Sequence, residues 1–328
     1  MRNITVFAVL VIMLGCAPFA AAQDAAPDEK SYALSSWTSF GTFLGQAEEI
    51  VYPPSGYKAE KFSQLLWDVL PVFYYGFSLD FSRTQPWEKW GFFATLSLRN
   101  GIPGKSGKME DRDWLSKEND ALTDFSVHDN FTNELFFFDI SAGLSLPLPL
   151  NQLLLKTYIT MSYMRFSFTG QYGHATYSMD DDPYNKSFAD WEKIINYTQT
   201  WITVAPGVSL GYYFNRFYAE LFFNISPLVS CDDVDEHLYI ELTPKVTTTS
   251  QYKDKMRGGV FLEPGFHFSF IANNRLEFAL DFSWRYMHGT RGETWSGSPI
   301  GTAHNVQNGE AGAGLSLFNI GLCMKIRL

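Results

Sequence analysis

The chain has 328 residues, a formal net charge of -10 at pH 7 and three cysteines. An acidic balance argues against nucleic acid and favours cationic partners, and three cysteines are too few for a disulfide framework. We interpret Cys231 and Cys323 as small apolar or rim residues, with a disulfide between them as the alternative. Aromatic residues make up 17% of the chain, yet mean hydropathy is only -0.11. A transmembrane β-barrel explains this combination, because it joins an apolar outer face to a polar lumen.

The N-terminus predicts a secretory signal peptide over residues 1–22. A positive charge precedes the apolar run Val6 to Leu14, and small residues follow up to Ala22, where we expect cleavage. A lipoprotein signal is the alternative, because Cys16 would then become a lipid-modified N-terminus. We expect residues 23–328 to form one domain.

Alternating hydrophobicity is the main structural signal in the rest of the chain. From Leu276 to Trp284 large apolar side chains occupy every second position, and residues 217–225 and 260–270 repeat the pattern. This is the two-residue period of a β-strand. Acidic residues inside these segments, such as Glu220 and Asp281, would be costly against lipid and therefore mark the lumen side. No stretch approaches the roughly 20 consecutive apolar residues of a transmembrane helix.

Turn signals divide the chain into ten such segments, joined by alternately short and long connectors. The segments lie near residues 32–46, 60–82, 90–100, 129–147, 152–172, 194–213, 217–232, 255–271, 276–292 and 311–328. The long polar connectors lie near residues 47–59, 101–128, 173–193, 233–254 and 293–310. We therefore predict an all-β fold, a single ten-stranded antiparallel transmembrane β-barrel with long extracellular loops and short periplasmic turns. A soluble β-sandwich is the alternative, although its strands usually have only about 3 to 10 residues.

Two polar clusters in the long loops contain groups suited to acid–base chemistry. Asp111 and Asp113 are two residues apart, so in an extended segment both carboxylates point to the same side, about 6 to 7 Å apart. Two such carboxylates can hold a water molecule and share its proton, since like charges raise one pKa. Asp235 and His237 have the same spacing, and there a carboxylate could orient an imidazole that works as general base.

Each cluster also has an interpretation without catalysis. An Asp-x-Asp pair in a loop is most often solvated or part of a calcium site, and a single Asp-x-His is no more specific. Residues 232–237 could bind a divalent metal, although they lack the glycine turn and spacing of an EF-hand loop. The residues alone leave this choice open.

Four separated stretches resemble segments of the omptin family of outer-membrane proteases, and they occur in the family's order. They are Glu-Ile-Val-Tyr at 49–52 with Phe-Ser-Gln-Leu-Leu-Trp at 62–67, Met-Glu-Asp-Arg-Asp-Trp at 109–114, Arg-Phe-Ser-Phe-Thr at 165–169 and Asp-Val-Asp-Glu-His at 233–237. The resemblance spans most of the chain after the signal and includes the ten-strand count. It implies an aspartyl endopeptidase of the outer membrane, with its active site facing the extracellular side, that cuts beside Arg or Lys.

Carried over position by position, the resemblance implies a catalytic set and a substrate pocket. The catalytic set is Asp111, Asp113, Asp235 and His237, with a water molecule between the Asp couple and the His–Asp dyad. Glu49 and Asp233 would bind the basic side chain before the cut. We expect cationic peptides or proteins as substrates, no nucleic acid partner, no metal or other resident cofactor, and a monomer.

The same resemblance implies contact with outer-membrane lipid. Omptins bind lipopolysaccharide on the outer wall, and Arg165 and Lys253 fall on two of the positions involved. Met161, Tyr163 and Thr200 occupy places where the family is more polar or basic. A lipopolysaccharide requirement is therefore open, and Arg165 could instead be a snorkelling residue at the membrane edge.

The strand period sets one condition on the site. If odd-numbered residues of the segment 217–225 face lipid, uninterrupted alternation sends Asp235 and His237 outward as well. We therefore predict a bulge near Pro227 or Cys231, since one extra residue reverses the faces of all that follow. The rival functions are a passive small porin, which bulky lumen residues disfavour, and a non-catalytic adhesin or receptor barrel on the same scaffold.

Overall fold

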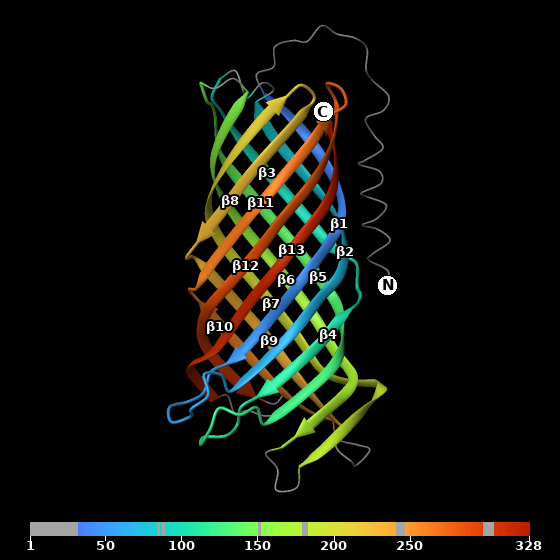
Figure 1. The fold of residues 1–328 in the computed structure, drawn as a ribbon, viewed down its shortest axis with the longest axis vertical. Coiled ribbons are helices and arrows are strands. Elements are labelled where there is room, and N and C mark those ends of the chain that lie inside the picture. Colours follow the sequence, from blue (N-terminus) through green and yellow to red (C-terminus); the bar gives the residue numbers. More distant parts are fainter. Residues whose placement is uncertain are drawn as a thin grey trace.

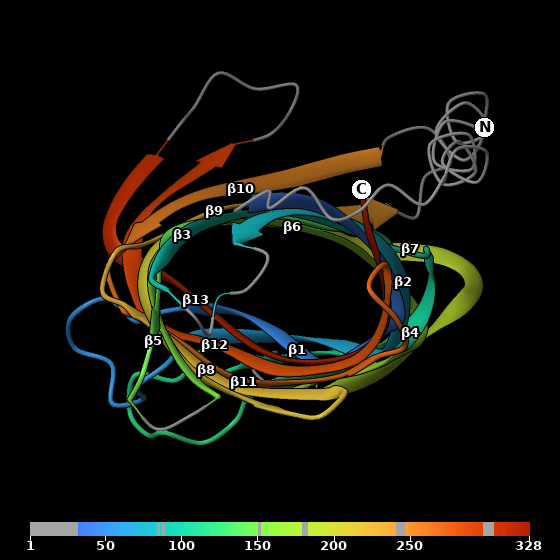
Figure 2. The ribbon, with the colours of Figure 1, turned by 90° about the horizontal axis from the view of Figure 1, so that it is seen from above.

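The structure, a computed structural model, describes residues 32–83, 86, 89–149, 152–178, 183–240, 247–297 and 305–328. The predicted signal peptide, residues 1–22 with Cys16, lies outside these residues. Figure 1 shows a tall barrel of tilted strands, and Figure 2, which looks along the barrel, shows a closed oval ring. No helix in the described part of the chain has the length and apolarity to cross a membrane.

Thirteen strands account for nearly all of the residues described. They are β1 (Tyr32–Val51), β2 (Ser63–Arg83), β3 (Gly91–Gly101), β4 (Gly104–Asp113), β5 (Asp124–Pro147), β6 (Leu153–Tyr177), β7 (Tyr184–Phe214), β8 (Phe217–Ser226), β9 (Val229–Ile240), β10 (Thr247–Arg257), β11 (Val260–Ile271), β12 (Leu276–Gly297) and β13 (Asn305–Arg327). The pairings between them are antiparallel.

Three short interruptions reduce these strands to a ring of ten. β3 and β4 together form one strand of the ring, interrupted at residues 102–103. In the same way β8 and β9 are interrupted at 227–228, and β10 and β11 at 258–259. β1 pairs with β2 on one side and with β13 on the other, which closes the ring. The prediction of a single ten-stranded antiparallel barrel is confirmed.

The two ends of the barrel differ in their connections. At the end called here the turn end, β7 meets β8 through residues 215–216, and β11 meets β12 through residues 272–275. Asn215 takes a φ of 57° there, in the left-handed region that Asn tolerates in tight turns. The opposite end, called the loop end, carries the longer connections between β1 and β2 and between β4 and β5.

The strands continue further toward the loop end than the sequence predicts. Much of the predicted loops 101–128, 173–193 and 233–254 is strand, namely β4 and parts of β5, β6, β7, β9 and β10. Above the lipid both faces of a strand are polar, so the hydrophobic alternation disappears while backbone pairing goes on. The prediction of loops at these positions is wrong, and the catalytic candidates lie on strands.

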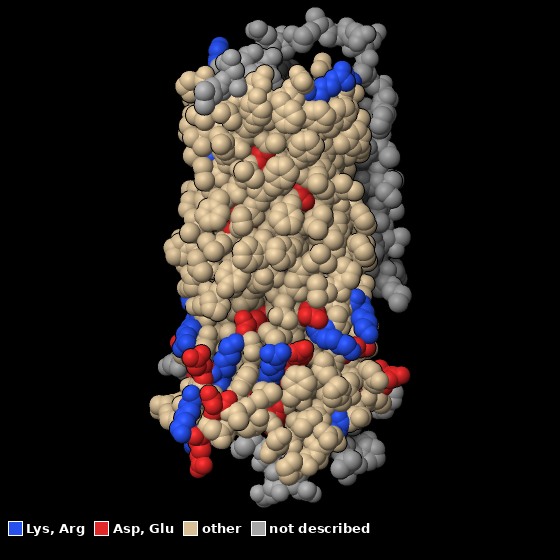
Figure 3. Space-filling view, viewed as in Figure 1, with Lys and Arg blue, Asp and Glu red and all other residues tan. Residues whose placement is uncertain are grey.

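Apolar side chains cover the outer wall between the two ends. The large exposed ones include Phe40, Phe73, Ile159, Leu221 and Leu322. Figure 3 shows this belt, in which only small patches of acidic atoms are visible, and, toward the loop end, a band where Lys, Arg, Asp and Glu gather. Such a belt faces lipid tails, and the charged band marks where the wall leaves the hydrocarbon.

Ion pairs fill the lumen at the level of the belt. The Arg285 guanidinium lies 3.0 Å from Asp139 and 2.7 Å from Glu263, and all three side chains are buried. Lys156 and Glu220 form a second pair at 2.7 Å. Charges buried in this way are tolerated because each has a partner. The lumen is therefore packed at this level, which disfavours a passive porin.

The interruption between β8 and β9 reverses the faces of the chain. Odd-numbered Leu221 and Ile225 of β8 are exposed on the outer wall, whereas odd-numbered Cys231 and Asp235 of β9 are buried on the lumen side. The irregularity falls at Pro227 and its successor. The predicted bulge near Pro227 is confirmed, and it turns the acidic end of β9 inward.

Candidate active site

A histidine and an aspartate meet on β9 at the loop end of the barrel. The Asp235 side chain is 3% exposed and the His237 side chain 26% exposed, and Asp235 Oδ2 lies 2.6 Å from His237 Nε2. Residues two apart on a strand share a face, and the buried Asp233 and Cys231 show that this face is the lumen side. The carboxylate therefore holds the imidazole by one ring nitrogen, as the sequence spacing predicts.

Two further aspartates face the lumen from β4. Asp111 pairs in register with Leu65 of β2 and Ser126 of β5. Met109, two residues earlier, is fully buried in the core, so Asp111 and Asp113 share its inward face. Asp111 Oδ1 is buried and has no hydrogen-bond partner among the residues described.

The β4 and β9 pairs influence each other across the barrel. Burial, and then Asp113, raise the pKa of Asp111 to about 8, with His237 acting in the opposite direction. Burial raises the pKa of Asp113 to about 6, against a lowering effect of Ser63. Burial alone would lower the pKa of His237, but Asp235, and then Asp111 and Asp113, raise it to about 9. The four candidate catalytic side chains thus form one electrostatically coupled group.

Glu49 and Asp233 form an acidic pocket beside this group. Both side chains belong to residues that are 3% exposed, Glu49 on β1 and Asp233 on β9. Burial raises the pKa of each well above its usual value, followed by Asp235 for Glu49 and by Asp254 for Asp233. Glu49 Oε2 and Asp233 Oδ1 have no hydrogen-bond partner in the described part of the chain. These two oxygens could receive a cation.

Three residues that the sequence analysis missed support or extend this pocket. Tyr197 donates a hydrogen bond to Asp233 Oδ2 at 2.9 Å, and the Gln199 amide donates to Tyr197 Oη at 3.0 Å. The third, Asp254 of β10, lies in register with Asp233. Tyr197 and Gln199 are a polar pair with strand spacing on β7, which is the signal that could have found them.

The proposed lipid contacts lie on the outer wall near the loop end. Arg165 Nε lies 3.0 Å from Glu134 Oε2, and Arg165 lines a hollow of about 420 Å³ with Thr198, Thr200 and Glu236. Lys253 is exposed on β10 and pairs in register with Val234, which also lines the hollow. The structure thus places both predicted basic residues on one wall, formed by β6, β7, β9 and β10.

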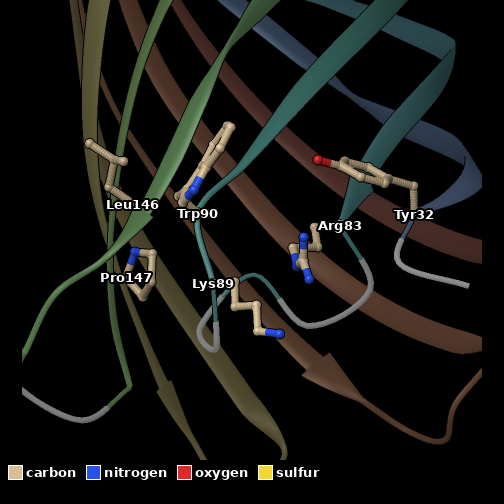
Figure 4. Close-up of a pocket in the computed structure, with 6 residues that line it drawn as sticks. All are labelled: Tyr32, Arg83, Lys89, Trp90, Leu146 and Pro147. Carbon is tan, nitrogen blue, oxygen red and sulfur yellow. The ribbon is translucent and has the colours of Figure 1, made fainter. Parts of the chain in front are cut away.

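A second hollow, of about 560 Å³, lies at the turn end (Figure 4). Its lining is Tyr32, Arg83, Lys89, Trp90, Leu146 and Pro147. It contains no carboxylate, histidine, serine, threonine or cysteine, so it is not the candidate for the catalysis predicted here. Across the described residues no three His, Cys, Asp or Glu side chains are arranged to hold a metal ion. Cys231 and Cys323 are both free thiols, so the disulfide alternative is wrong.

Comparison with known proteins identifies the family of this barrel. The fold and its apolar belt define an outer-membrane β-barrel, here with an acidic and histidine-containing site at one end. The Omptin family model matches residues 30–328, and the chain belongs to that family. A plasminogen activator of Yersinia pestis is 26% identical over 274 residues, which cover 80% of this chain and 82% of that protein. The crystal structure of the outer membrane protease OmpT from Escherichia coli has the same fold, with a TM-score of 0.80 and 20% identity over 94% of this chain and 99% of that one.

Proposed function

We propose that this chain is an outer-membrane endopeptidase that hydrolyses peptide bonds next to Arg or Lys. The observation that supports it most is the Asp235–His237 pair at 2.6 Å, electrostatically coupled to Asp111 and Asp113 of the opposite wall. Membership of the Omptin family agrees with it, as do the names of two similar proteins, a plasminogen activator and an outer membrane protease. In this proposal the loop end, and the site with it, faces the cell exterior.

The proposed mechanism uses an activated water molecule and no covalent enzyme intermediate. His237, held at Nε2 by Asp235, accepts a proton from the water at Nδ1 as the water oxygen attacks the peptide carbonyl carbon. Asp235 stabilises the imidazolium that results. His237 then gives the proton to the leaving amine as the carbon–nitrogen bond breaks.

Asp111 and Asp113 take complementary parts in this scheme. The raised pKa of Asp111, about 8, keeps a proton on this carboxyl at neutral pH, and a protonated carboxyl can donate a hydrogen bond to the carbonyl oxygen as negative charge develops there. The pKa of Asp113 is lower, about 6. Its carboxylate therefore accepts a hydrogen bond from the water and orients it.

The acidic pocket supplies the specificity for basic residues. Glu49 and Asp233 are buried and each offers an unpartnered oxygen. A guanidinium or ammonium group satisfies such oxygens, whereas a neutral side chain leaves them without partners at a cost of about 1 to 3 kcal/mol each. Cationic peptides or proteins are accordingly the proposed substrates of a monomeric enzyme.

We propose that lipopolysaccharide supports the activity from outside the barrel. The hollow beside Arg165 is also lined by Asp233, and the exposed Lys253 pairs in register with Val234, so both basic residues lie at the level of the acidic pocket. Basic side chains at this height suit the phosphate groups of a lipid headgroup. β9 belongs both to this wall and to the site. Its buried odd-numbered residues face the lumen, and its even-numbered residues line the hollow outside.

Cleavage of a quenched peptide containing Arg-Arg or Arg-Lys tests the proposal. The protein is refolded in detergent with and without lipopolysaccharide, and cleavage is followed for the parent, His237→Ala and Asp111→Asn. His288→Ala is the matched control, because His288 is an exposed histidine on β12. Both site variants should lose activity and the control should keep it. Unchanged cleavage by His237→Ala rejects the mechanism, and peptide binding without cleavage by the parent would favour the adhesin or receptor alternative.

A further inference from the structure

Asp254 is a buried acid whose place in the barrel the sequence gives no reason to notice. It lies on β10 directly opposite Asp233 of β9, and residues opposed in this way on one face have Cβ atoms about 4.5 to 5.5 Å apart. Asp254 is 3% exposed, whereas Lys253 and Lys255 on either side are exposed on the outer wall. Its Oδ1 has no hydrogen-bond partner among the described residues.

Asp254 joins Glu49 and Asp233 to make a group of three buried carboxylates from three strands. Each offers one unpartnered oxygen, and none of the three takes part in an ion pair within the described chain. The other groups around them are also acidic or neutral: Asp111 from β4, Tyr197 from β7, Cys231 and Asp235 from β9, and Thr294 from β12. His237, on the same strand as Asp233, is paired with Asp235.

Such a group has no value for the stability of the fold. Buried carboxylates without a counterion destabilise a folded chain through lost hydration and mutual repulsion. Tyr197, which donates a hydrogen bond to Asp233, is itself fixed by stacking on Trp67 with 5.3 Å between ring centroids. Acids kept in this state at the mouth of a barrel are best explained by a cation that enters from outside.

We propose that Asp254 is a specificity-determining residue: with Glu49 and Asp233 it surrounds the basic side chain before the cut, and that side chain enters in exchange for a proton of the three carboxylates. The assignment rests on the proposed function for the identity of the site. One positive charge arrives as the guanidinium or ammonium group, and one leaves as a proton taken up by buffer, so the charge of the pocket is unchanged.

The protonation of Asp254 agrees with this exchange. Burial, and to a smaller extent Asp235, raise the pKa of Asp254 to about 7, against an opposing effect of Thr294. The pKa values of Glu49 and Asp233 are raised as well. Asp254 therefore holds a proton in about half of the empty pockets at pH 7, and an incoming cation favours its release.

Calorimetric titration of a binding-only protein tests the proposal without requiring cleavage. The host is folded His237→Ala protein in detergent with lipopolysaccharide, and the probe is a blocked tetrapeptide with a central arginine. The matched probe carries citrulline, which has the same shape without the charge. Titration at pH 7 in two buffers of different ionisation enthalpy gives the number of protons released on binding.

We expect the arginine peptide to release up to one proton and to bind at least about 10-fold more tightly than the citrulline peptide. Adding Asp254→Asn should reduce arginine affinity at least about 10-fold and lower the proton count, and Asp254→Glu should restore part of both. Glu293→Gln is the control, because Glu293 is exposed on β12 beside the register partner of Asp254. It should change neither quantity.

Thermal unfolding separates this role from a structural one. Asp254→Asn removes a repelled buried charge and should leave the unfolding midpoint unchanged or raise it. Unchanged arginine affinity and proton release in Asp254→Asn would overturn the proposal, as would failure of the arginine peptide to bind the His237→Ala host. Arginine binding by a parent protein that does not cleave would instead refute the proposed protease and leave the pocket assignment standing.

Discussion

The Asp235–His237 pair predicts an alkaline pH profile that one substitution should move. The carboxylate raises the pKa of His237 to about 9 in spite of burial, and the gap from the ordinary value of 6.5 is worth roughly 3 kcal/mol at about 1.36 kcal/mol per pH unit. A raised pKa favours the imidazolium, so the neutral base appears only as pH rises toward 9. The same mechanism needs the proton on Asp111, whose pKa is about 8. We therefore expect kcat/KM of the parent to pass through a maximum between about pH 8 and 9. Asp235→Asn removes the largest raising influence on His237 and should move this maximum downward by about 1 pH unit, with kcat reduced about 10²- to 10⁴-fold.

The assay is kcat/KM on a quenched arginine peptide between pH 5 and pH 10, for the parent and Asp235→Asn. The pair's contribution to stability is fully present below about pH 6.5 and is lost as pH rises through about 9. Each sample therefore needs a check of folding, for which the mobility of unheated protein on a gel is suitable. A maximum that stays between about pH 8 and 9 in Asp235→Asn would show that this carboxylate does not set the protonation of His237. A parent maximum near pH 7 would refute the electrostatic reasoning as a whole, because His237 would then have its ordinary pKa.

Three further predictions concern the opposite wall, the lipid contact and the lumen. Asp111→Asn should lower kcat/KM at least about 10²-fold while thermal unfolding shows equal or greater stability, because a buried repelled carboxyl is removed. Arg165→Gln should raise the lipopolysaccharide concentration for half-maximal cleavage about 10-fold, measured by titration at fixed peptide, and full activity at the parental concentration would contradict the lipid assignment. Arg285→Met leaves Glu263 without its ionic partner and Asp139 with Arg99 alone, and it should destabilise the barrel by about 3 to 5 kcal/mol in urea unfolding. The folded fraction of Arg285→Met should keep its kcat/KM, since the lumen pairs lie at the level of the belt and not at the site.

The ten membrane-crossing strands could be predicted because contact with lipid imposes a pattern on their sequence. Where a strand faces hydrocarbon outside and polar groups inside, every second residue must be apolar, as in β12 between Leu276 and Trp284. Beyond the belt water replaces lipid, and both faces can be polar. β9 and β10 continue there with no pattern that distinguishes them from a loop, so their length depends on pairing between the two strands, which a single segment does not reveal.

The candidate site was predictable only where its residues are neighbours in the chain. Asp235 with His237, and Asp111 with Asp113, share a strand face, and the family resemblance gave them roles. Even so, the inward direction of Asp235 depends on the break at Pro227, which parity required and the structure confirms. A lone acid between two lysines is ordinary on a solvated surface, so Asp254 became visible only when the register placed it opposite Asp233.

The barrel contains two sets of buried acidic side chains, one with basic partners and one without. In the lumen, Asp139 and Glu263 pair with Arg285, and Glu220 pairs with Lys156. At the loop end the three carboxylates of the acidic pocket, Glu49, Asp233 and Asp254, have no such partner in the described chain. The same strands could carry a lysine or arginine there as easily as they do at the level of the belt. The packed ion pairs close the lumen at the level of the belt, and the acidic pocket lies between them and the loop end. A cationic segment can therefore enter the pocket only from the loop end. The position of these unpaired carboxylates at the loop end therefore supports the proposal that basic polypeptides bind at the mouth of the barrel, and the packed lumen disfavours the passive porin.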